Sequence, residues 1–132
     1  MSTENNALFY AKASVETMMC KFQAAELPPK GHFHYHQGVF LSGVYQTYRL
    51  CGDRRYFDYI KGWVDSCVNE KGEIHECDLG ELDDIQPGIL LYPLLDETGD
   101  ERYKKARDTL IAAVAGFRRH EVGGIGHREA SE

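Results

Sequence analysis

Three histidines at alternate positions form the first group in this sequence that could carry chemistry. If the segment is extended, His32, His34 and His36 lie on one side of it, where their imidazoles could ligate a metal ion. No acidic or cysteine ligand stands beside them, so the pattern favours loop histidines at a helix entrance, and we predict neither a metal nor a cofactor. The same histidines, together with Tyr35, could instead present polar groups to a sugar.

A second candidate lies in the acidic residues that precede the apolar run 89–92. Asp83 or Asp84 could cap the N-terminus of a helix, because the exposed amides and the positive end of the helix dipole favour a carboxylate there. The functional alternative is a carboxylate at the mouth of a pocket. From these residues alone, capping is the favoured interpretation.

Five helices should position these residues, and no strand is predicted. The apolar spacing and the positions of glycine and proline predict their bounds. The expected ranges are 4–25, 37–50, 53–72, 85–95 and 100–117. The second and fourth helices are apolar nearly all round and belong inside, with Pro93 kinking the fourth. The other three are amphipathic and belong outside.

The helices form a repeat. Gly52-Asp53-Arg54-Arg55-Tyr56 and Gly99-Asp100-Glu101-Arg102-Tyr103 share the pattern Gly-Asp-x-Arg-Tyr at an offset of 47 residues. Upstream of each, Gln37-Gly38 resembles Gln86-x-Gly88. Repeated helical hairpins with alternating inner and outer helices predict concentric layers, in a toroid or in an open solenoid.

The repeat brings distant candidate residues into register. Tyr35, Asp83 and His127 lie 48 and 44 residues apart, so each should precede an inner helix at the same end of the protein. This spacing favours the functional interpretation of Asp83. The neighbouring helix N-termini would supply positive potential for an anionic ligand such as a uronate carboxylate.

The composition excludes several classes of function. The chain has 15 basic and 21 acidic residues and a net charge of −6, with no basic stripe that could bind a nucleic acid. Its apolar runs are much shorter than the roughly 18 residues of a membrane span. The N-terminus lacks the basic and apolar regions of a secretory signal, so we expect a cytoplasmic protein whose four cysteines are reduced.

Four stretches carry a resemblance to a known family. They are Glu26-Leu27-Pro28-Pro29, His34-Tyr35-His36-Gln37-Gly38-Val39-Phe40-Leu41, Glu81-Leu82-Asp83-x-Ile85-Gln86-x-Gly88 and Asp100-Glu101-Arg102-Tyr103. There the sequence resembles the unsaturated rhamnogalacturonyl hydrolases of glycoside hydrolase family 105 and, more distantly, the unsaturated glucuronyl hydrolases of family 88. The resemblance implies an all-α (α/α)6 barrel, a toroid of six hairpins. Residues 1–132 would form the N-terminal part of this single domain, with about two and a half hairpins.

The resemblance also implies an activity and a set of site residues. The substrate would be a short oligosaccharide with a 4,5-unsaturated uronic acid at its non-reducing end, derived from pectin or rhamnogalacturonan. An aspartic acid protonates C4, water adds at C5, and the resulting hemiketal opens and releases the next sugar. Asp83 matches the first of two family carboxylates, Tyr35 matches a tyrosine that lines the site, and His127 and Arg128 match substrate-binding residues.

The principal catalytic aspartate of the family would lie beyond residue 132. General acid–base catalysis contributes roughly 10²–10⁴-fold, so this chain alone should be nearly inactive. One alternative is a non-catalytic helical-repeat module that binds a carbohydrate or a protein through its concave face. Others are self-association through exposed inner helices and a metal-binding regulator built on the three histidines.

Overall fold

The computed structural model describes residues 3–117, and the regular elements among them are helices. They are α1 (Thr3–Lys21), the 3₁₀ turn η1 (Ala24–Glu26), α2 (Tyr35–Cys51), α3 (Arg54–Cys67), α4 (Leu82–Ile85), the 3₁₀ helix η2 (Gln86–Leu90), α5 (Leu91–Thr98) and α6 (Glu101–Ala115). An isolated antiparallel bridge joins Val68 to Ile74. Within this part of the chain, every helix is too short or too polar to cross a membrane.

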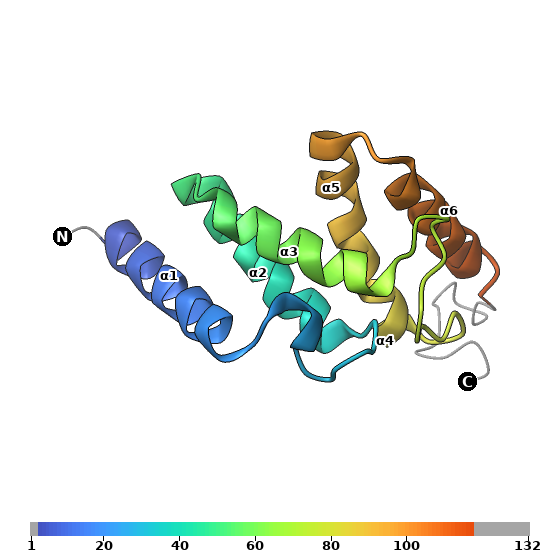
Figure 1. Cartoon of the computed structure of the whole chain (residues 1–132), viewed down its shortest axis with the longest axis horizontal. Coiled ribbons are helices and arrows are strands. Elements are labelled where there is room, and N and C mark those ends of the chain that lie inside the picture. Colours follow the sequence, from blue (N-terminus) through green and yellow to red (C-terminus); the bar gives the residue numbers. More distant parts are fainter. Residues whose placement is uncertain (1–2, 118–132) are drawn as a thin grey trace, which may run out of the picture.

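The helices follow one another across the molecule, from α1 at one end to α6 at the other (Figure 1). α2 packs against α3 and also against η2, while α5 packs against α6. The result is two helical hairpins, α2–α3 and α5–α6, preceded by α1. η2 leads directly into α5, the inner helix of the second hairpin, and its contact with α2 joins the inner sides of the two hairpins.

The joints of the two hairpins have the same structure. Gly52 and Gly99 end α2 and α5 in the left-handed region, with φ values of 70° and 69°, which glycine adopts without steric cost. Asp53 and Asp100 then cap α3 and α6, because each side chain accepts a hydrogen bond from the backbone N–H two residues later. The repeated pentapeptide is therefore a helix stop followed by a helix start.

The tyrosine of each pentapeptide connects neighbouring outer helices. Tyr56 on α3 donates a hydrogen bond to Glu16 on α1, with an oxygen–oxygen distance of 3.0 Å. Tyr103 on α6 donates in the same way to Asp65 on α3. Both side chains are fully buried, and burial raises the pKa of Tyr56 to about 12, so its hydroxyl stays a neutral donor.

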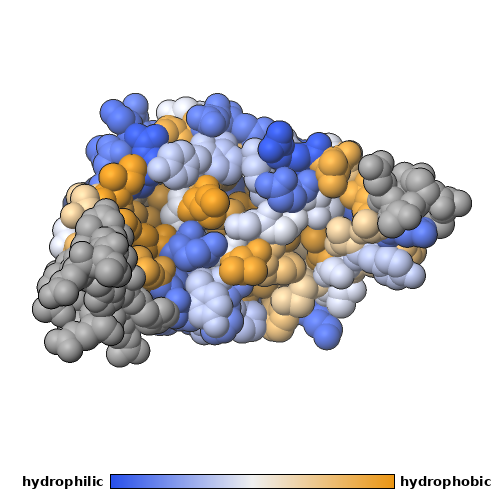
Figure 2. Space-filling model, turned by 180° about the vertical axis from the view of Figure 1, so that it is seen from behind, coloured by the Kyte–Doolittle hydropathy of each residue, from blue (hydrophilic) through white to orange (hydrophobic). Residues whose placement is uncertain are grey.

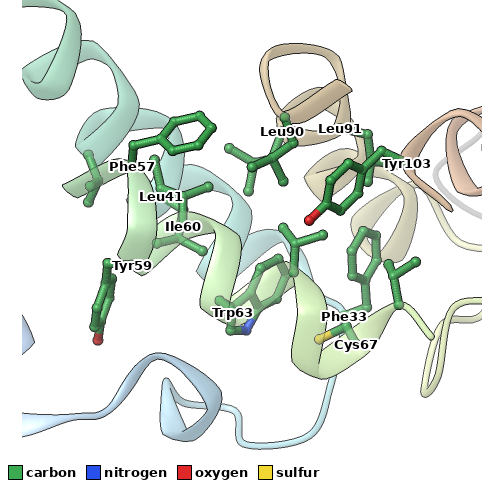
Figure 3. Close-up of a cluster of buried hydrophobic side chains, with 14 of the residues drawn as sticks. Phe33, Leu41, Phe57, Tyr59, Ile60, Trp63, Cys67, Leu90, Leu91 and Tyr103 are labelled. Atoms are coloured by element: carbon green, nitrogen blue, oxygen red, sulfur yellow. The ribbon is translucent and has the colours of Figure 1, made fainter. Parts of the chain in front are cut away.

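The core lies between α2, α3 and the second hairpin, and Figure 3 shows part of it. α3 contributes more residues to it than any other helix, and its buried residues are Tyr56, Phe57, Tyr59, Ile60, Trp63, Val64 and Cys67. Trp63 stacks on Phe33, which precedes α2, with 5.4 Å between the ring centroids and 13° between the ring planes. This stack attaches the entrance of α2 to the core.

Two helices are shorter than the sequence predicted. α1 ends at Lys21 rather than at position 25, and α3 ends at Cys67 rather than at position 72. Just after α3, the side-chain oxygen of Asn69 accepts hydrogen bonds from the backbone N–H groups of Lys71 and Glu73. These bonds give the backbone an alternative to another helical turn.

The predicted helix 85–95 is wrong in detail, because it is divided into α4, η2 and α5. Pro87 has no N–H group and cannot donate the bond that would continue α4 as an α-helix, so the chain runs through a 3₁₀ segment there. Pro93 falls in the first turn of α5, where its missing N–H leaves no bond unmade. The sharp change of helix type therefore occurs at Pro87, not at Pro93.

Several apolar side chains of the inner helices are exposed. The exposed fractions are 58% for Val39 on α2, 57% for Ile89 on η2 and 47% for Tyr92 on α5. The view from behind in Figure 2 shows hydrophobic residues in separate patches between polar ones. Self-association through these helices stays a prediction.

Candidate active site

The histidine segment is held in place by the residue in its middle. Phe33 is fully buried, and its backbone N–H donates to the carbonyl of Glu76 in the loop between α3 and α4, at 3.1 Å. Because Phe33 points into the core, the flanking His32 and His34 are left at the surface of the α2 entrance. The centroids of their two rings are 5.0 Å apart.

Asp84 connects three segments at this end of the molecule. Its side chain is only 6% exposed, and it accepts hydrogen bonds from the backbone N–H of Asp78 at 2.7 Å and from Nε2 of His32 at 3.1 Å. Nε2 of His34 lies 3.9 Å from the other carboxylate oxygen. The carboxylate thus holds the α3–α4 loop and the α2 entrance against α4.

An open depression of about 510 Å³ lies over these contacts. Its ionisable lining residues are His32, His34, Glu76, Cys77, Asp78, Glu81 and Asp84. Carboxylates accept hydrogen bonds, so this surface suits ligand groups that donate them, such as sugar hydroxyls.

The N-terminus of α2 is electropositive, in contrast to the acidic depression. The first backbone N–H groups of a helix have no partner within the helix, and they lie at the positive end of its dipole. In α2 no side chain caps them, and the first turn contains no acidic residue. Tyr35 and His36 occupy this turn, and their ring centroids are 4.1 Å apart. The turn is suited to a carboxylate.

Tyr35 and Asp83, the two predicted site residues that the structure describes, belong to the same end of the helical layer. Their sequence neighbours His34 and Asp84 approach to 3.9 Å, and α2 packs against α4. Tyr35 is 36% exposed and Asp83 is partly buried. Neither lines the depression of 510 Å³.

His127 and Arg128, the other two predicted site residues, lie outside the described residues.

The chain is similar to known glycoside hydrolases. The model of Glycosyl Hydrolase Family 88 matches residues 10–132. The chain belongs to this family. It is also similar to a solved glycoside hydrolase of family 105 from C. acetobutylicum ATCC 824, with a TM-score of 0.81 and 27% sequence identity. That similarity covers 90% of this chain and 32% of the solved chain, so the sequence spans about a third of the length of that relative.

These relationships confirm the predicted family and fold class. The described part of this family 88 chain is all-α, and its hairpins agree with part of an (α/α)6 toroid such as that of the family 105 relative. They also associate the chain with a family of glycosidases.

The structure corrects one interpretation of the acidic segment. Glu81 occupies the N-cap position of α4, and neither Asp83 nor Asp84 caps that helix. Asp84 makes tertiary contacts instead, because its carboxylate accepts hydrogen bonds from the backbone of the α3–α4 loop and from His32. Sequence reasoning did not separate the two adjacent aspartates, since four residues of helix give no periodicity that would tell which one is buried.

Cys77 is a further residue of this site that the sequence did not single out. Its thiol donates to the backbone carbonyl of Asp84 at 3.4 Å. Burial, reinforced by the negative charges of Asp84 and Asp78, raises the pKa of the Cys77 thiol to about 12. The group is therefore a neutral thiol near pH 7.

The histidines cluster as their spacing suggested, but the described residues contain no group of three or more His, Cys, Asp or Glu side chains arranged to hold a metal ion.

A second hollow, of about 440 Å³, lies between the inner and outer helices of the second hairpin. Its lining is mostly apolar, with residues such as Ile89, Leu110 and Val114, and includes one charged side chain, Arg107. Among the described residues that line it there is no carboxylate or histidine.

Proposed function

We propose that this chain supplies part of the sugar-binding site of a glycoside hydrolase that acts on unsaturated uronyl oligosaccharides from pectin or rhamnogalacturonan. The observation that carries the proposal is the contact between the α2 entrance and α4. It brings the segments of Tyr35 and Asp83 to one end of the inner helices, although they are 48 residues apart in the sequence. Membership of Glycosyl Hydrolase Family 88 supports the same class of chemistry.

The proposed reaction is the addition of water across the C4=C5 double bond of the terminal uronate. A carboxylic acid gives its proton to C4, and a water molecule adds to C5 as it returns a proton to the carboxylate. The product is a hemiketal, which opens and releases the next sugar. In this proposal the acid itself is supplied by further residues. Asp83 is the carboxylate of this chain that contacts the sugar and supports that acid, and Tyr35 lines the site.

The two electrostatic environments of the site fit the two kinds of group on such a sugar. The uncapped N-terminus of α2 suits the uronate carboxylate. The depression beside Asp84 suits the hydroxyl groups, which can donate to its carboxylates. His127 and Arg128 remain proposed substrate-binding residues.

The chain covers 32% of the family 105 relative, so we propose that the 132 residues bind the sugar without turning it over. Such a chain should bind unsaturated digalacturonate in a calorimetric titration. It should not remove the ultraviolet absorbance of the sugar's conjugated double bond. Turnover by this chain would overturn the proposal that the acid of the reaction is supplied by further residues.

Asp83→Asn tests the site directly. A hydrogen bond to a charged group contributes about 1.5–3 kcal/mol, so the substitution should weaken binding by roughly 10- to 100-fold. Asp96→Asn is the matched control, because Asp96 is exposed on α5 and undergoes the same chemical change. Equal affinities for the two variants would remove Asp83 from the site.

The non-catalytic binding module stays the alternative function. Binding by itself fits both functions, so the distinguishing measurement is turnover by a complete barrel that contains these residues. If such a barrel binds the sugar without turning it over, the binding module is favoured.

A further inference from the structure

We propose that Asp84 is a positioning residue that fixes the tautomers of the histidines at the α2 entrance. Through His34 it leaves the exposed His36 with an unprotonated Nε2, which accepts a hydrogen bond from a hydroxyl group of the ligand. The identity of that ligand as a sugar rests on the proposed function. The tautomers themselves follow from the contacts alone.

The carboxylate of Asp84 determines which nitrogen carries the proton in His32 and His34. A carboxylate only accepts hydrogen bonds, so the Nε2 atom of His32, 3.1 Å from Oδ2 of Asp84, must carry its proton. Nε2 of His34 faces Oδ1 at 3.9 Å, which is longer than a hydrogen bond. At this distance the charge of Asp84 still favours an N–H group over a lone pair. The neutral His34 ring therefore carries its proton on Nε2.

The tautomer of His34 in turn determines that of His36. The Nδ1 atoms of His34 and His36 are 3.0 Å apart, so one of them must donate a hydrogen bond and the other must accept it. Neutral His34 with its proton on Nε2 has a lone pair on Nδ1. His36 must then donate from Nδ1, and its own Nε2 is left as an acceptor.

The surroundings of the His34 ring favour the same tautomer. The other ionisable residues that line the depression with His34 are Glu76, Cys77, Asp78 and Glu81. Three of them are acidic, so they add to the negative potential that favours Nε2–H on His34. Cys77 is a neutral thiol, because its pKa is raised to about 12.

The unprotonated Nε2 of His36 lies where a ligand can reach it. The residue is exposed in the first turn of α2, beside Tyr35 and the uncapped helix N-terminus. A neutral ring there presents one acceptor next to groups that donate. A ligand with adjacent carboxylate and hydroxyl groups, as in a uronate, satisfies both kinds of partner.

The test uses the 132-residue chain labelled with ¹⁵N in its histidines. Long-range proton–nitrogen correlation spectra at about pH 8, where an ordinary histidine is neutral, identify the nitrogen that carries the proton. We expect Nε2–H at His32 and His34 and Nδ1–H at His36. In Asp84→Asn the preference of His36 for Nδ1–H should fall by about tenfold, which corresponds to ~1.4 kcal/mol. Asp96→Asn, the same change at an exposed position of α5, should leave it unchanged.

A proton on Nε2 of His36 in the unmodified chain would overturn the inference, whether or not the Asp84→Asn variant folds. An unchanged preference in a folded Asp84→Asn variant would also overturn it. The outcome is separable from that of the proposed function. If unsaturated digalacturonate fails to bind a chain with the expected tautomers, the proposed function fails and the positioning role of Asp84 stands.

Discussion

The close approach of the two inner helices depends on Gly38. A Cβ atom added at this residue of α2 would lie 2.0 Å from Oε1 of Gln86 and 3.0 Å from Cα of Pro87. The first neighbour is the buried end of a side chain and the second is backbone. Gly38→Ala should therefore push η2 away from α2 and loosen the contact that brings the candidate site together.

A second glycine on the same helix provides a matched control. A Cβ atom at Gly43 would meet no atom within 4 Å. In both cases the glycine carbonyl accepts a bond from a hydroxyl side chain four residues later, Ser42 for Gly38 and Thr47 for the next glycine. Replacing a helical glycine by alanine stabilises by roughly 0.5–1 kcal/mol when nothing clashes.

The two variants share the gain in helix propensity, so their difference isolates the clash. Overpacking of this kind costs about 1–3 kcal/mol. Gly38→Ala should therefore unfold more readily than Gly43→Ala by about this amount. With a urea dependence of about 1–3 kcal/mol per molar, the unfolding midpoints should differ by roughly 1 M. Urea unfolding of the two variants, followed by far-ultraviolet circular dichroism, measures this difference. Equal midpoints would refute the geometry of the α2–η2 contact.

Two further predictions concern pH and reactivity. Burial raises the pKa of Tyr56 to about 12, so the hydroxyl loses its proton at a lower pH in the unfolded chain than in the folded one. The free energy of unfolding should therefore fall as the pH rises from about 10 to about 12. Urea unfolding midpoints across this range should fall less steeply in Tyr56→Phe, and an identical slope would contradict the assignment. The thiol of Cys77, whose pKa is raised to about 12, should react with iodoacetamide at about pH 8 much more slowly than exposed Cys20. Mass spectrometry of the labelled peptides measures the two rates. Equal rates would contradict the burial of the Cys77 thiol.

The sequence predicts the helical joints well because their chemistry is local. A glycine that can adopt a positive φ and an aspartate that can cap the next helix act within a few residues, so Gly52-Asp53 and Gly99-Asp100 are readable without a structure. The order of helices and the family follow from the same short motifs. The break at Pro87 was not predicted, because the expected range 85–95 places this proline in the first turn of a helix, where proline is tolerated.

The candidate site is less predictable because its contacts join distant segments. The sequence identifies the acidic pair and the histidines as separate groups. It does not show that His32 lies against Asp84, 52 residues later, or that the loop carrying Asp78 turns back to the same carboxylate. Which of two adjacent aspartates is buried depends on these tertiary contacts. Sequence spacing correctly brought Tyr35 and Asp83 to one end of the helices.

The most direct test of the central claim is to locate the sugar on the chain. Unsaturated digalacturonate is titrated into the ¹⁵N-labelled 132-residue chain, and the backbone amide shifts are mapped. The account predicts that the largest changes occur at the start of α2, around Tyr35, and in α4, around Asp83. Changes confined to the apolar hollow between η2 and α6, around Ile89 and Leu110, would contradict it.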